Sequence, residues 1–233
     1  MKLLLVGYGK MGQLVGELAG QYGCEVAGVI DPASPRHGGA ADADCWAGAG
    51  VDVAIDFSTA DSVVTNASAL ARRGISLVVG TTGWGQHEAA LRQVIADSGA
   101  GIVVAPNFST GVVVFEAIVA HAAKLFAPQA DFGAFLHESH HAAKKDAPSG
   151  TALLLKRSME QAGFPRPIDV AATRAGFIPG THTIGFDGPA ETITLTHAAR
   201  DRTAFARGAL AAARWVHGKH GWFTMQDVLG FKK

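Results

Sequence analysis

The sequence predicts an α/β fold, with a doubly wound parallel sheet in the first half of the chain and a second domain of the α+β kind after it. Three observations predict this. Short apolar runs alternate with amphipathic stretches up to Asn107, a glycine-rich turn follows the first run, and the alternation stops after Asn107. Because only crossover helices join parallel strands compactly, the repeated order of strand and helix indicates a parallel sheet with helices on both faces.

The elements of the first half can be placed from their composition. Short runs, rich in β-branched residues and apolar on both faces, predict buried strands at residues 2–7, 25–31, 51–57, 75–80 and 102–106. Amphipathic stretches predict helices at residues 10–22, 60–73 and 86–98. Residues 31–44, rich in proline, glycine and alanine, are predicted to form a loop.

After Asn107 strands and helices no longer alternate regularly. Helices are predicted at Thr110–Phe126, at 149–161 and, rich in alanine, at 203–217. Strands are predicted at residues 131–137, 169–174, 181–186 and 191–197. The alternation Thr-Ile-Thr-Leu-Thr at 192–196 is typical of a sheet with one covered face, and this part of the chain therefore reads as an α+β domain.

Composition excludes several classes of protein. Twenty Lys and Arg residues balance twenty Asp and Glu residues, so we expect no basic face for nucleic acid, and 48% hydrophobic residues suffice for a core. The first apolar run ends at Gly7, short of the roughly 7–15 residues of a signal-peptide core. The most apolar later stretch, 111–126, contains Glu116 and Lys124, so we expect no membrane span.

The two cysteines, Cys24 and Cys45, lack the spacing of a metal site and suggest no disulfide framework. We expect both to be small core residues. Together with the composition, they predict a soluble, cytoplasmic protein.

The glycine-rich turn indicates a nucleotide site. Gly7, Gly9 and Gly12 form a G-x-G-x-x-G pattern between a strand and a helix, in which they permit the tight turn, the approach of a pyrophosphate and helix–sheet packing. The second strand ends at Asp31, whose carboxylate could accept the hydroxyls of an adenosine ribose. A purely structural glycine turn is the alternative, but strand, helix and acidic residue in register predict a Rossmann-type, dinucleotide-binding domain.

A second segment, 137–151, is rich in histidine and lysine. His137 and His141 match the H-E-x-x-H pattern of zinc proteases, which needs a helix so that both histidines share one face. A strand is expected before His137, and Pro148 stops any long helix after it. We therefore expect no metal site.

Acid–base chemistry fits the segment better. His140, His141 and Lys144 place proton carriers and a fixed cation together at a strand end. The helix after them opens with N–H groups that can bind a carboxylate or phosphate, at Ser149, Gly150 and Thr151. The structural alternative is a helix cap at Ser149 beside solvated side chains, and it becomes less plausible as more such residues gather in one short segment.

Residues 138–152 resemble the signature of the dihydrodipicolinate reductases: Glu-Ser-His-His, then Lys144, then Asp-Ala-Pro-Ser-Gly-Thr-Ala. The resemblance extends over nearly the whole chain, through residues 7–12, 56–58, 80–84, 105–109, 174–176, 180–182 and Arg202. The glycine loop departs from the family, which often begins it with extra small residues.

The resemblance implies an enzyme of the diaminopimelate route to lysine that uses NADH or NADPH to reduce a cyclic imine dicarboxylate. It implies a dinucleotide-binding domain of residues 1–107 plus 203–233, and a substrate-binding and oligomerisation domain of residues 108–202, in a homotetramer. His140 would be the general acid/base and Lys144 the second proton donor. Substrate contacts would come from His141, Ser149, Gly150, Thr151 and Arg202. Cofactor contacts would come from Gly7, Gly9, Lys10, Met11, Gly12, Asp31, Gly80, Thr81, Thr82, Ala105, Pro106, Asn107 and Phe108.

The cofactor preference is balanced. The Asp31 carboxylate would repel a 2′-phosphate, and Pro32 stands where some family members have an arginine. Lys10 and Arg36 could instead reach a 2′-phosphate. We expect both cofactors to work, with NADH modestly preferred.

Two other classes of function stay open. One is another two-domain pyridine-nucleotide dehydrogenase acting on amino acids, which would lack the cluster from His140 to Thr151. The other is a non-catalytic dinucleotide sensor, which would not need His140 and Lys144 together.

Overall fold

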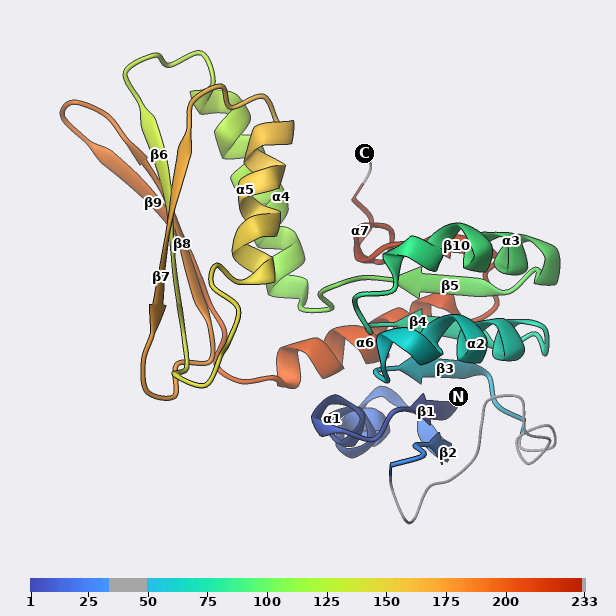
Figure 1. The fold of residues 1–233 in the computed structure, drawn as a ribbon. Helices are drawn as coiled ribbons and strands as arrows, with labels where there is room; N and C mark the ends of the chain where they lie inside the picture. Colours follow the sequence, from blue (N-terminus) through green and yellow to red (C-terminus); the bar gives the residue numbers. More distant parts are fainter. Residues whose placement is uncertain (34–49, 232–233) are drawn as a thin grey trace. The chain divides into compact units, whose positions relative to one another are not determined.

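The computed structural model describes residues 1–33 and 50–231, and contacts divide the chain into two compact units. The first comprises Met1–Thr110 and Thr203–Lys233, and the second Gly111–Arg202. Both contain sheets and helices, so the predicted α/β class is confirmed (Figure 1). Arg36 and Cys45 lie outside the described residues.

The first unit is built on a six-stranded parallel sheet in the order β10-β5-β4-β3-β1-β2. Its strands are β1 (Lys2–Val6), β2 (Glu25–Ile30), β3 (Val53–Asp56), β4 (Ser76–Val79), β5 (Gly101–Val104) and β10 (Gly221–Phe223). The chain runs from β1 outward to β2 and then returns to place β3 on the other side of β1. The strand order therefore reverses between β1 and β3, the kind of position at which open α/β sheets bind ligands.

Helices cover both faces of this sheet, as predicted. They are α1 (Lys10–Leu18), α2 (Ala60–Ala71), α3 (Glu88–Ser98), α6 (Thr203–Val216) and α7 (Met225–Val228), with 3₁₀ turns η1 (Ala19–Tyr22) and η3 (Gly85–His87). One core cluster joins Leu4 and Leu77 of the strands to Leu70 of α2 and Leu91 of α3. Helices α1 and α6 pack on each other, and α6 also contacts β3, β4 and β5.

Some boundaries differ from the sequence-based expectation. The helix predicted at 10–22 changes at Ala19 into a 3₁₀ turn that ends at Gly23, whose φ of 66° is left-handed. The helix predicted at 86–98 likewise begins as a 3₁₀ turn. Strand β10 and helix α7 were not predicted, because β10 has only three residues and is defined by its pairing with β5.

The second unit has a mixed four-stranded sheet in the order β7-β6-β8-β9. Its elements are α4 (Thr110–Phe126), β6 (Gly133–His140), α5 (Gly150–Gln161), β7 (Ile168–Arg174), β8 (Thr181–Asp187) and β9 (Thr192–Ala198). Helix α5 is the crossover between the parallel strands β6 and β7, whereas β8 and β9 are antiparallel to their neighbours. Figure 1 shows α4 and α5 side by side on one face of this sheet.

The alternation of burial along β6 reflects this one-sided cover. Ala134 and Leu136 are buried, and both belong to a core that includes Leu155 of α5 and Phe186 of β8. Phe135 faces the other way and is exposed. The face of the sheet opposite the helices therefore has no cover within this unit.

The strand predicted at 131–137 was wrong at both ends, since β6 runs from Gly133 to His140. It continues because both neighbours pair with it: Glu138 lies opposite His182 of β8, and His140 lies opposite Arg174 of β7. This extension places Glu138 and His140 on the buried side of the sheet, where a loop had been expected.

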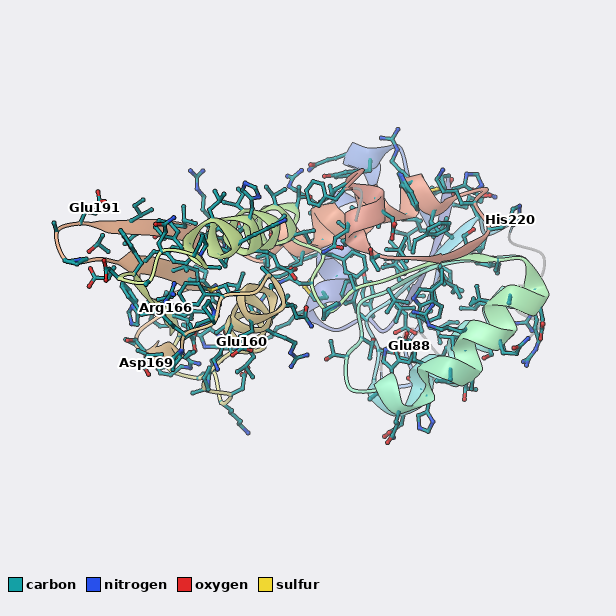
Figure 2. The ribbon with its side chains drawn as sticks, turned by 90° about the horizontal axis from the view of Figure 1, so that it is seen from above. Glu88, Glu160, Arg166, Asp169, Glu191 and His220 are labelled. Atoms are coloured by element: carbon teal, nitrogen blue, oxygen red, sulfur yellow. The ribbon has the colours of Figure 1, made fainter. Side chains whose placement is uncertain are left out.

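Arg166 closes the carboxyl end of α4 (Figure 2). Its guanidinium donates hydrogen bonds to the carbonyl oxygens of Phe126, at 2.8 Å, and Ala127, at 3.3 Å, and lies over the ring of Phe164. A cation at a helix C-terminus satisfies carbonyl groups that have no partner within the helix. Within residues 1–33 and 50–231, no helix is both long and apolar enough to cross a membrane.

The close contact between α6 and the segment after β5 provides a test of the first unit. A Cβ at Gly208 of α6 would overlap the carbonyl oxygen of Phe108, and this backbone atom cannot easily move away. We expect Gly208→Ala to cost about 1–3 kcal/mol in the free energy of unfolding. At roughly 2–4 °C per kcal/mol for a chain of this size, calorimetry would register the loss as a lower Tm.

Gly16→Ala in helix α1 is the matched control, since the nearest neighbouring atom to a Cβ at Gly16 would lie 3.6 Å away. That substitution should be neutral or stabilising, because alanine favours a helix over glycine by roughly 0.5–1 kcal/mol. Equal Tm values for Gly208→Ala and wild type would contradict the packing described here.

Candidate functional site

The glycine loop after β1 is shaped by close backbone approaches. Gly7 has a left-handed φ of 87°, and a Cβ there would overlap the backbone of Phe57. A Cβ at Gly12 would overlap the carbonyl oxygen of Gly7. Gly9 is the N-cap of α1, makes no side-chain cap and has open space around it. The first N–H groups of α1 therefore have no acceptor within the helix, the arrangement that binds phosphate groups.

Asp31 is anchored to this loop. Its carboxylate accepts the N–H of Tyr8 at 2.7 Å and the N–H of Ala33 at 2.9 Å. It lines a cavity of about 670 Å³ together with Gly7, Gly9, Phe57 and Ser58, among others. A second cavity, of about 450 Å³, shares Gly9, Phe57 and Ser58 with the first and adds Lys10, Met11, Gly80, Thr81 and Thr82. Adjoining cavities at the carboxyl edge of the sheet fit the two halves of a dinucleotide.

Asp56, which was not among the predicted site residues, connects the two turns that line these cavities. It is the last residue of β3, and 2% of its surface is exposed. Burial raises the pKa of its carboxyl group, and the hydrogen bonds that it accepts offset only part of this rise. One oxygen, Oδ1, accepts the N–H of Ser58 at 2.9 Å, the hydroxyl of Ser58 at 2.7 Å and the hydroxyl of Thr81 at 2.8 Å. Asp56 thereby joins the turns that follow β3 and β4.

The predicted cofactor residues after β5 lie at the same sheet edge but line neither of these two cavities. The N–H of Ala105 donates to the carbonyl of Val79 at 3.2 Å. Phe108 packs edge-on against Phe57, with ring centroids 6.1 Å apart. These contacts set the start of the segment that leads to α4; Pro106 is exposed and Asn107 caps the N–H of Ser109.

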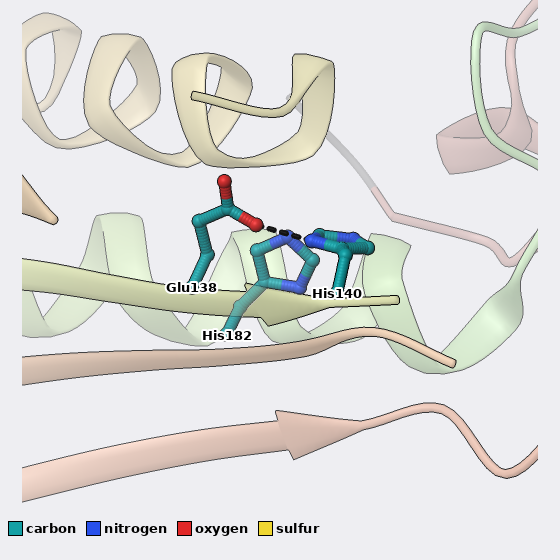
Figure 3. Close-up of side chains that lie close together, drawn as sticks. All are labelled: Glu138, His140 and His182. Carbon is teal, nitrogen blue, oxygen red and sulfur yellow. Dashed lines mark hydrogen bonds and ion pairs between the residues drawn. The ribbon is translucent and has the colours of Figure 1, made fainter. Parts of the chain in front are cut away.

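A buried polar cluster lies in the second unit (Figure 3). Glu138, with none of its surface exposed, accepts a hydrogen bond from Nδ1 of His140 at one oxygen, Oε2. Its other oxygen, Oε1, accepts from Arg174 at 2.6 Å and from the N–H of Ser149 at 3.1 Å. One carboxylate thus joins two neighbouring strands to the start of α5.

The electrostatics of this pair are set by opposing effects. Burial would raise the pKa of Glu138, but the hydrogen bonds from Arg174, Ser149 and His140 outweigh it and hold that pKa below its ordinary value. Burial lowers the pKa of His140, Glu138 opposes this, and the cations Lys144 and Arg174 add to the lowering. Glu138 is therefore a carboxylate, and it favours the charged form of the histidine beside it.

His182 completes the cluster from β8. Its ring meets that of His140 edge-on at 5.1 Å, and its Nε2 lies 3.1 Å from the Ser149 hydroxyl. The same hydroxyl accepts the N–H of Ala152 and so caps α5. Burial, reinforced by the charge of His140, lowers the pKa of His182 to about 4, so that this ring is neutral at pH 7.

Most of the remaining predicted site residues lie in the turn between β6 and α5 or at the start of α5. Nζ of Lys144 pairs with the carboxylate of Asp146 at 2.7 Å. His141 is half-buried in this turn, and Gly150 and Thr151 open α5. Arg202 is exposed and lies between β9 and α6, outside this turn.

A metal ion suits this cluster poorly. Ligand atoms of Glu138, His140 and His182 lie within 4.8 Å of one another, close enough to consider one. Both oxygens of Glu138 and Nδ1 of His140 are already engaged in hydrogen bonds, however, and the guanidinium of Arg174 would repel a cation. His137 points to the exposed side of β6 and bonds Thr173 at 3.0 Å, so the H-E-x-x-H pattern lacks the helix that it needs.

No role was predicted for Glu138, Arg174 or His182 from the sequence, although all three lie in segments that resemble the family. A signal was available for Glu138, because it continues the buried register of Ala134 and Leu136 two residues further on. Ending the strand at residue 137 concealed that register. Arg174 and His182 become neighbours of Glu138 only through strand pairing, which their own local sequence does not specify.

The chain matches two family models, described as Dihydrodipicolinate reductase, N-terminus, over residues 1–108, and Dihydrodipicolinate reductase, C-terminus, over residues 111–229. It is 37% identical over 235 residues to the 4-hydroxy-tetrahydrodipicolinate reductase of Rhodopseudomonas palustris, covering 92% of this chain and 84% of that protein. It is 37% identical over 247 residues to the protein of the same name from Methanoregula boonei, covering 97% and 96%.

Solved structures share the fold. A dihydrodipicolinate reductase from a Paenisporosarcina species, described with dipicolinate bound, aligns with a TM-score of 0.83 at 22% identity, covering 97% of this chain and 98% of that one. A probable dehydrogenase from Thermotoga maritima aligns with a TM-score of 0.60 at 9% identity, covering 98% and 92%.

The buried, neutral His182 predicts acid sensitivity. In the unfolded chain this histidine binds a proton near pH 6.5, whereas in the folded chain it does so only near pH 4. The unfolded state therefore binds more protons between these values, and the free energy of unfolding should fall as the pH is lowered through this window. The contribution of His182 to that loss is up to about 3 kcal/mol.

Urea unfolding of wild type and His182→Gln at several pH values between 4 and 7 measures this contribution. The variant should be less stable at pH 7 but lose less stability on acidification. His121→Gln, which removes an exposed histidine of α4, is the control. Parallel pH slopes for wild type and His182→Gln would contradict a neutral buried ring.

Proposed function

The chain belongs to the dihydrodipicolinate reductase family, and we propose accordingly that it is an NAD(P)H-dependent oxidoreductase that reduces 4-hydroxy-tetrahydrodipicolinate in the diaminopimelate route to lysine. One feature of the site gives this proposal its strongest support. A buried carboxylate–histidine pair, Glu138 and His140, lies in the segment that also holds Lys144 and the start of α5. This combination supplies a proton and binds a carboxylate, the two tasks that reduction of a cyclic imine dicarboxylate demands.

The turn between β6 and α5 supports carboxylate binding. Asp146 accepts a hydrogen bond from Lys144, which lowers the pKa of its carboxyl group, and the backbone N–H of Gly150 contributes to the same effect. A carboxylate of the chain itself is thus stabilised by the groups that we assign to substrate. His141, Ser149, Gly150, Thr151 and Arg202 are the further substrate-binding residues that we propose.

His140 is the proposed general acid. Its Nδ1 donates a hydrogen bond to Glu138, so Nε2 is the nitrogen that is available to exchange a proton. A Cβ at Gly180 would lie 3.0 Å from Nε2, so the absence of a side chain there leaves room beside the ring. Lys144, a fixed cation three residues beyond His141, is the proposed second proton donor.

The first unit supplies the proposed dinucleotide site. The close approaches at Gly7 and Gly12, the uncapped start of α1 and the adjoining cavities all fit a pyrophosphate with a nucleoside on either side. When bound, NADH or NADPH supplies the hydride. We assign cofactor contacts to Gly7, Gly9, Lys10, Met11, Gly12, Asp31, Gly80, Thr81, Thr82, Ala105, Pro106, Asn107 and Phe108.

In domain terms, we propose that residues 1–107 and 203–233 bind the cofactor, and that residues 108–202 bind substrate and form a homotetramer. The uncovered face of the second sheet supports this assembly, because it exposes Phe135 beside Thr194 and Thr196 of β9. We place the enzyme in the cytoplasm, where reduced cofactor is available and where a free thiol such as that of Cys24 stays reduced.

The assay that tests the function is oxidation of NADH with freshly generated substrate, made in the same reaction by the preceding aldolase-type synthase. Turnover that persists in EDTA supports a metal-free reductase. Turnover only with amino acids would favour another dehydrogenase, and cofactor binding without turnover would favour a sensor.

We predict that His140 and Lys144 act in catalysis rather than in folding. His140→Ala and Lys144→Ala should each lower kcat by ~10²-fold or more, the usual effect of losing acid–base help. The Tm of Lys144→Ala should stay close to that of wild type, whereas His140→Ala, which removes a hydrogen-bond donor to the buried Glu138, should lower the Tm without preventing folding. Lys145→Ala, which removes the exposed neighbouring cation, is the control and should keep its activity. Near-full activity in either of the first two variants would show that the assigned role is wrong.

Cofactor preference gives the second test. Asp31 disfavours a 2′-phosphate, whereas binding one with Lys10 or Arg36 costs roughly 1.5–2 kcal/mol of side-chain entropy. We predict that both cofactors work and that NADH is preferred by ~10-fold or less, about 1.4 kcal/mol. Steady-state kcat/KM values at matched ionic strength measure this. A clear preference for NADPH would reverse the prediction, and Lys10→Ala and Arg36→Ala would then identify the residue responsible.

A further inference from the structure

We propose that Glu138 is a positioning residue that holds His140 in the one protonation pattern useful for catalysis, with Nδ1–H bound and Nε2 left to exchange the proton. The proposal deepens the proposed function and rests on it for the role of His140. It assigns to Glu138 an effect on chemistry that is separate from its contribution to the fold.

The geometry around Glu138 requires a carboxylate. Three donors converge on it: Nδ1 of His140 at one oxygen, and Arg174 and the N–H of Ser149 at the other. None of the Glu138 surface is exposed, so water does not compete for these bonds. A carboxylate has two oxygens and no donor, and it can satisfy all three groups. A carboxamide has one acceptor oxygen and must direct its NH₂ group at one of the donors.

The tautomer of His140 follows from this. Glu138 can only accept, so the hydrogen of the neutral ring must be on Nδ1. Exchange with a reacting group is then confined to Nε2. The main chain supports the arrangement, because the carbonyl of His140 accepts the N–H of Ala175 at 2.9 Å and so fixes the end of β6.

Glu138 also decides which of the two buried histidines takes up a proton. His182 contacts the Ser149 hydroxyl through Nε2, and its Nδ1 is buried without a hydrogen-bond partner among the described residues. Burial lowers the pKa of His182, and no hydrogen bond to a carboxylate offsets this effect, so the ring stays neutral. His140 is buried as well, but its bond to Glu138 offsets part of the penalty for the charged form.

The charged groups that face His140 come from every element around it. Glu138 shares its strand, Arg174 lies opposite on β7, His182 lies on β8, and Lys144 belongs to the turn that follows. Removing the negative charge of Glu138 leaves two cations near His140, and the pKa of His140 should then fall. Removing Arg174 takes away one cation and should raise it. These opposite signs separate positioning from general damage to the fold.

The experiment measures the pH dependence of kcat and kcat/KM for Glu138→Gln and Arg174→Gln, together with the titration of the His140 ring by NMR. A general acid is active while protonated, so activity declines as the pH rises through its pKa. For Glu138→Gln we expect kcat to fall by ~10²-fold at pH 7, with a smaller change in the KM for substrate. The decline on the alkaline side should move to lower pH. For Arg174→Gln it should move to higher pH.

Glu116→Ala is the control for structural loss. Glu116 lies on α4 in the same unit, accepts a hydrogen bond from the Ser158 hydroxyl at 2.6 Å and is not among the groups that shift the pKa of His140. Its loss should lower the Tm but leave the pH profile and the His140 titration unchanged. An effect of Glu138→Gln on Tm alone, with an unshifted profile and an unshifted His140 titration, would overturn the proposal.

The readouts distinguish a failure of the proposed function from a failure of the proposed role of Glu138. If the wild-type protein does not turn over the substrate, the proposed function fails, while the NMR titration of His140 still tests the link to Glu138. If Glu138→Gln does not fold, Arg174→Gln decides, and a His140 pKa that is unchanged or lowered in that variant overturns the proposal.

Discussion

The second unit depends on one buried carboxylate. Glu138 is fully enclosed, and its charge is tolerated because Arg174, Ser149 and His140 all donate to it. Removing one partner of such a group leaves a buried charge uncompensated, which is far more costly than losing a surface ion pair. The same bonds join β6 to β7 and fix Ser149, the N-cap of α5. Architecture and chemistry therefore rest on the same atoms, and a change at Glu138 reaches both.

In the first unit, close packing around glycines, rather than a buried charge, determines the local structure of the site. Gly7, Gly12 and Gly80 each stand where a Cβ would overlap a neighbour, respectively the backbone of Phe57, the carbonyl of Gly7 and the ring of Phe57. Close approach of backbone to backbone leaves N–H groups exposed at the start of α1. A dinucleotide is recognised by such groups, whereas a small dicarboxylate and a proton transfer require side chains with adjusted pKa values.

Much of the fold follows from local sequence. Buried parallel strands appear as continuous apolar runs, and their carboxyl ends meet at one edge, so the amino-acid pattern alone places the glycine loop, Asp31 and Thr81 together. The ends of several helices and strands, in contrast, were predicted wrongly. Strand β6 extends to His140 only because β7 and β8 pair with it, and β10 exists only because β5 lies beside it. Pairing energy is non-local, and a window of sequence does not contain it.

Local sequence was enough to predict the parallel sheet, the glycine loop and the gathering of His140, Lys144 and Ser149 near one turn, because these depend on periodicity and on neighbours along the chain. It took the packed fold to establish that Glu138 points inward, that Arg174 neutralises it and that His182 stays uncharged beside it. Arg174 and Glu138 lie on different strands, 36 positions apart. Their meeting is fixed by strand register, and the charge state of each buried group is set by the neighbours that this register brings to it.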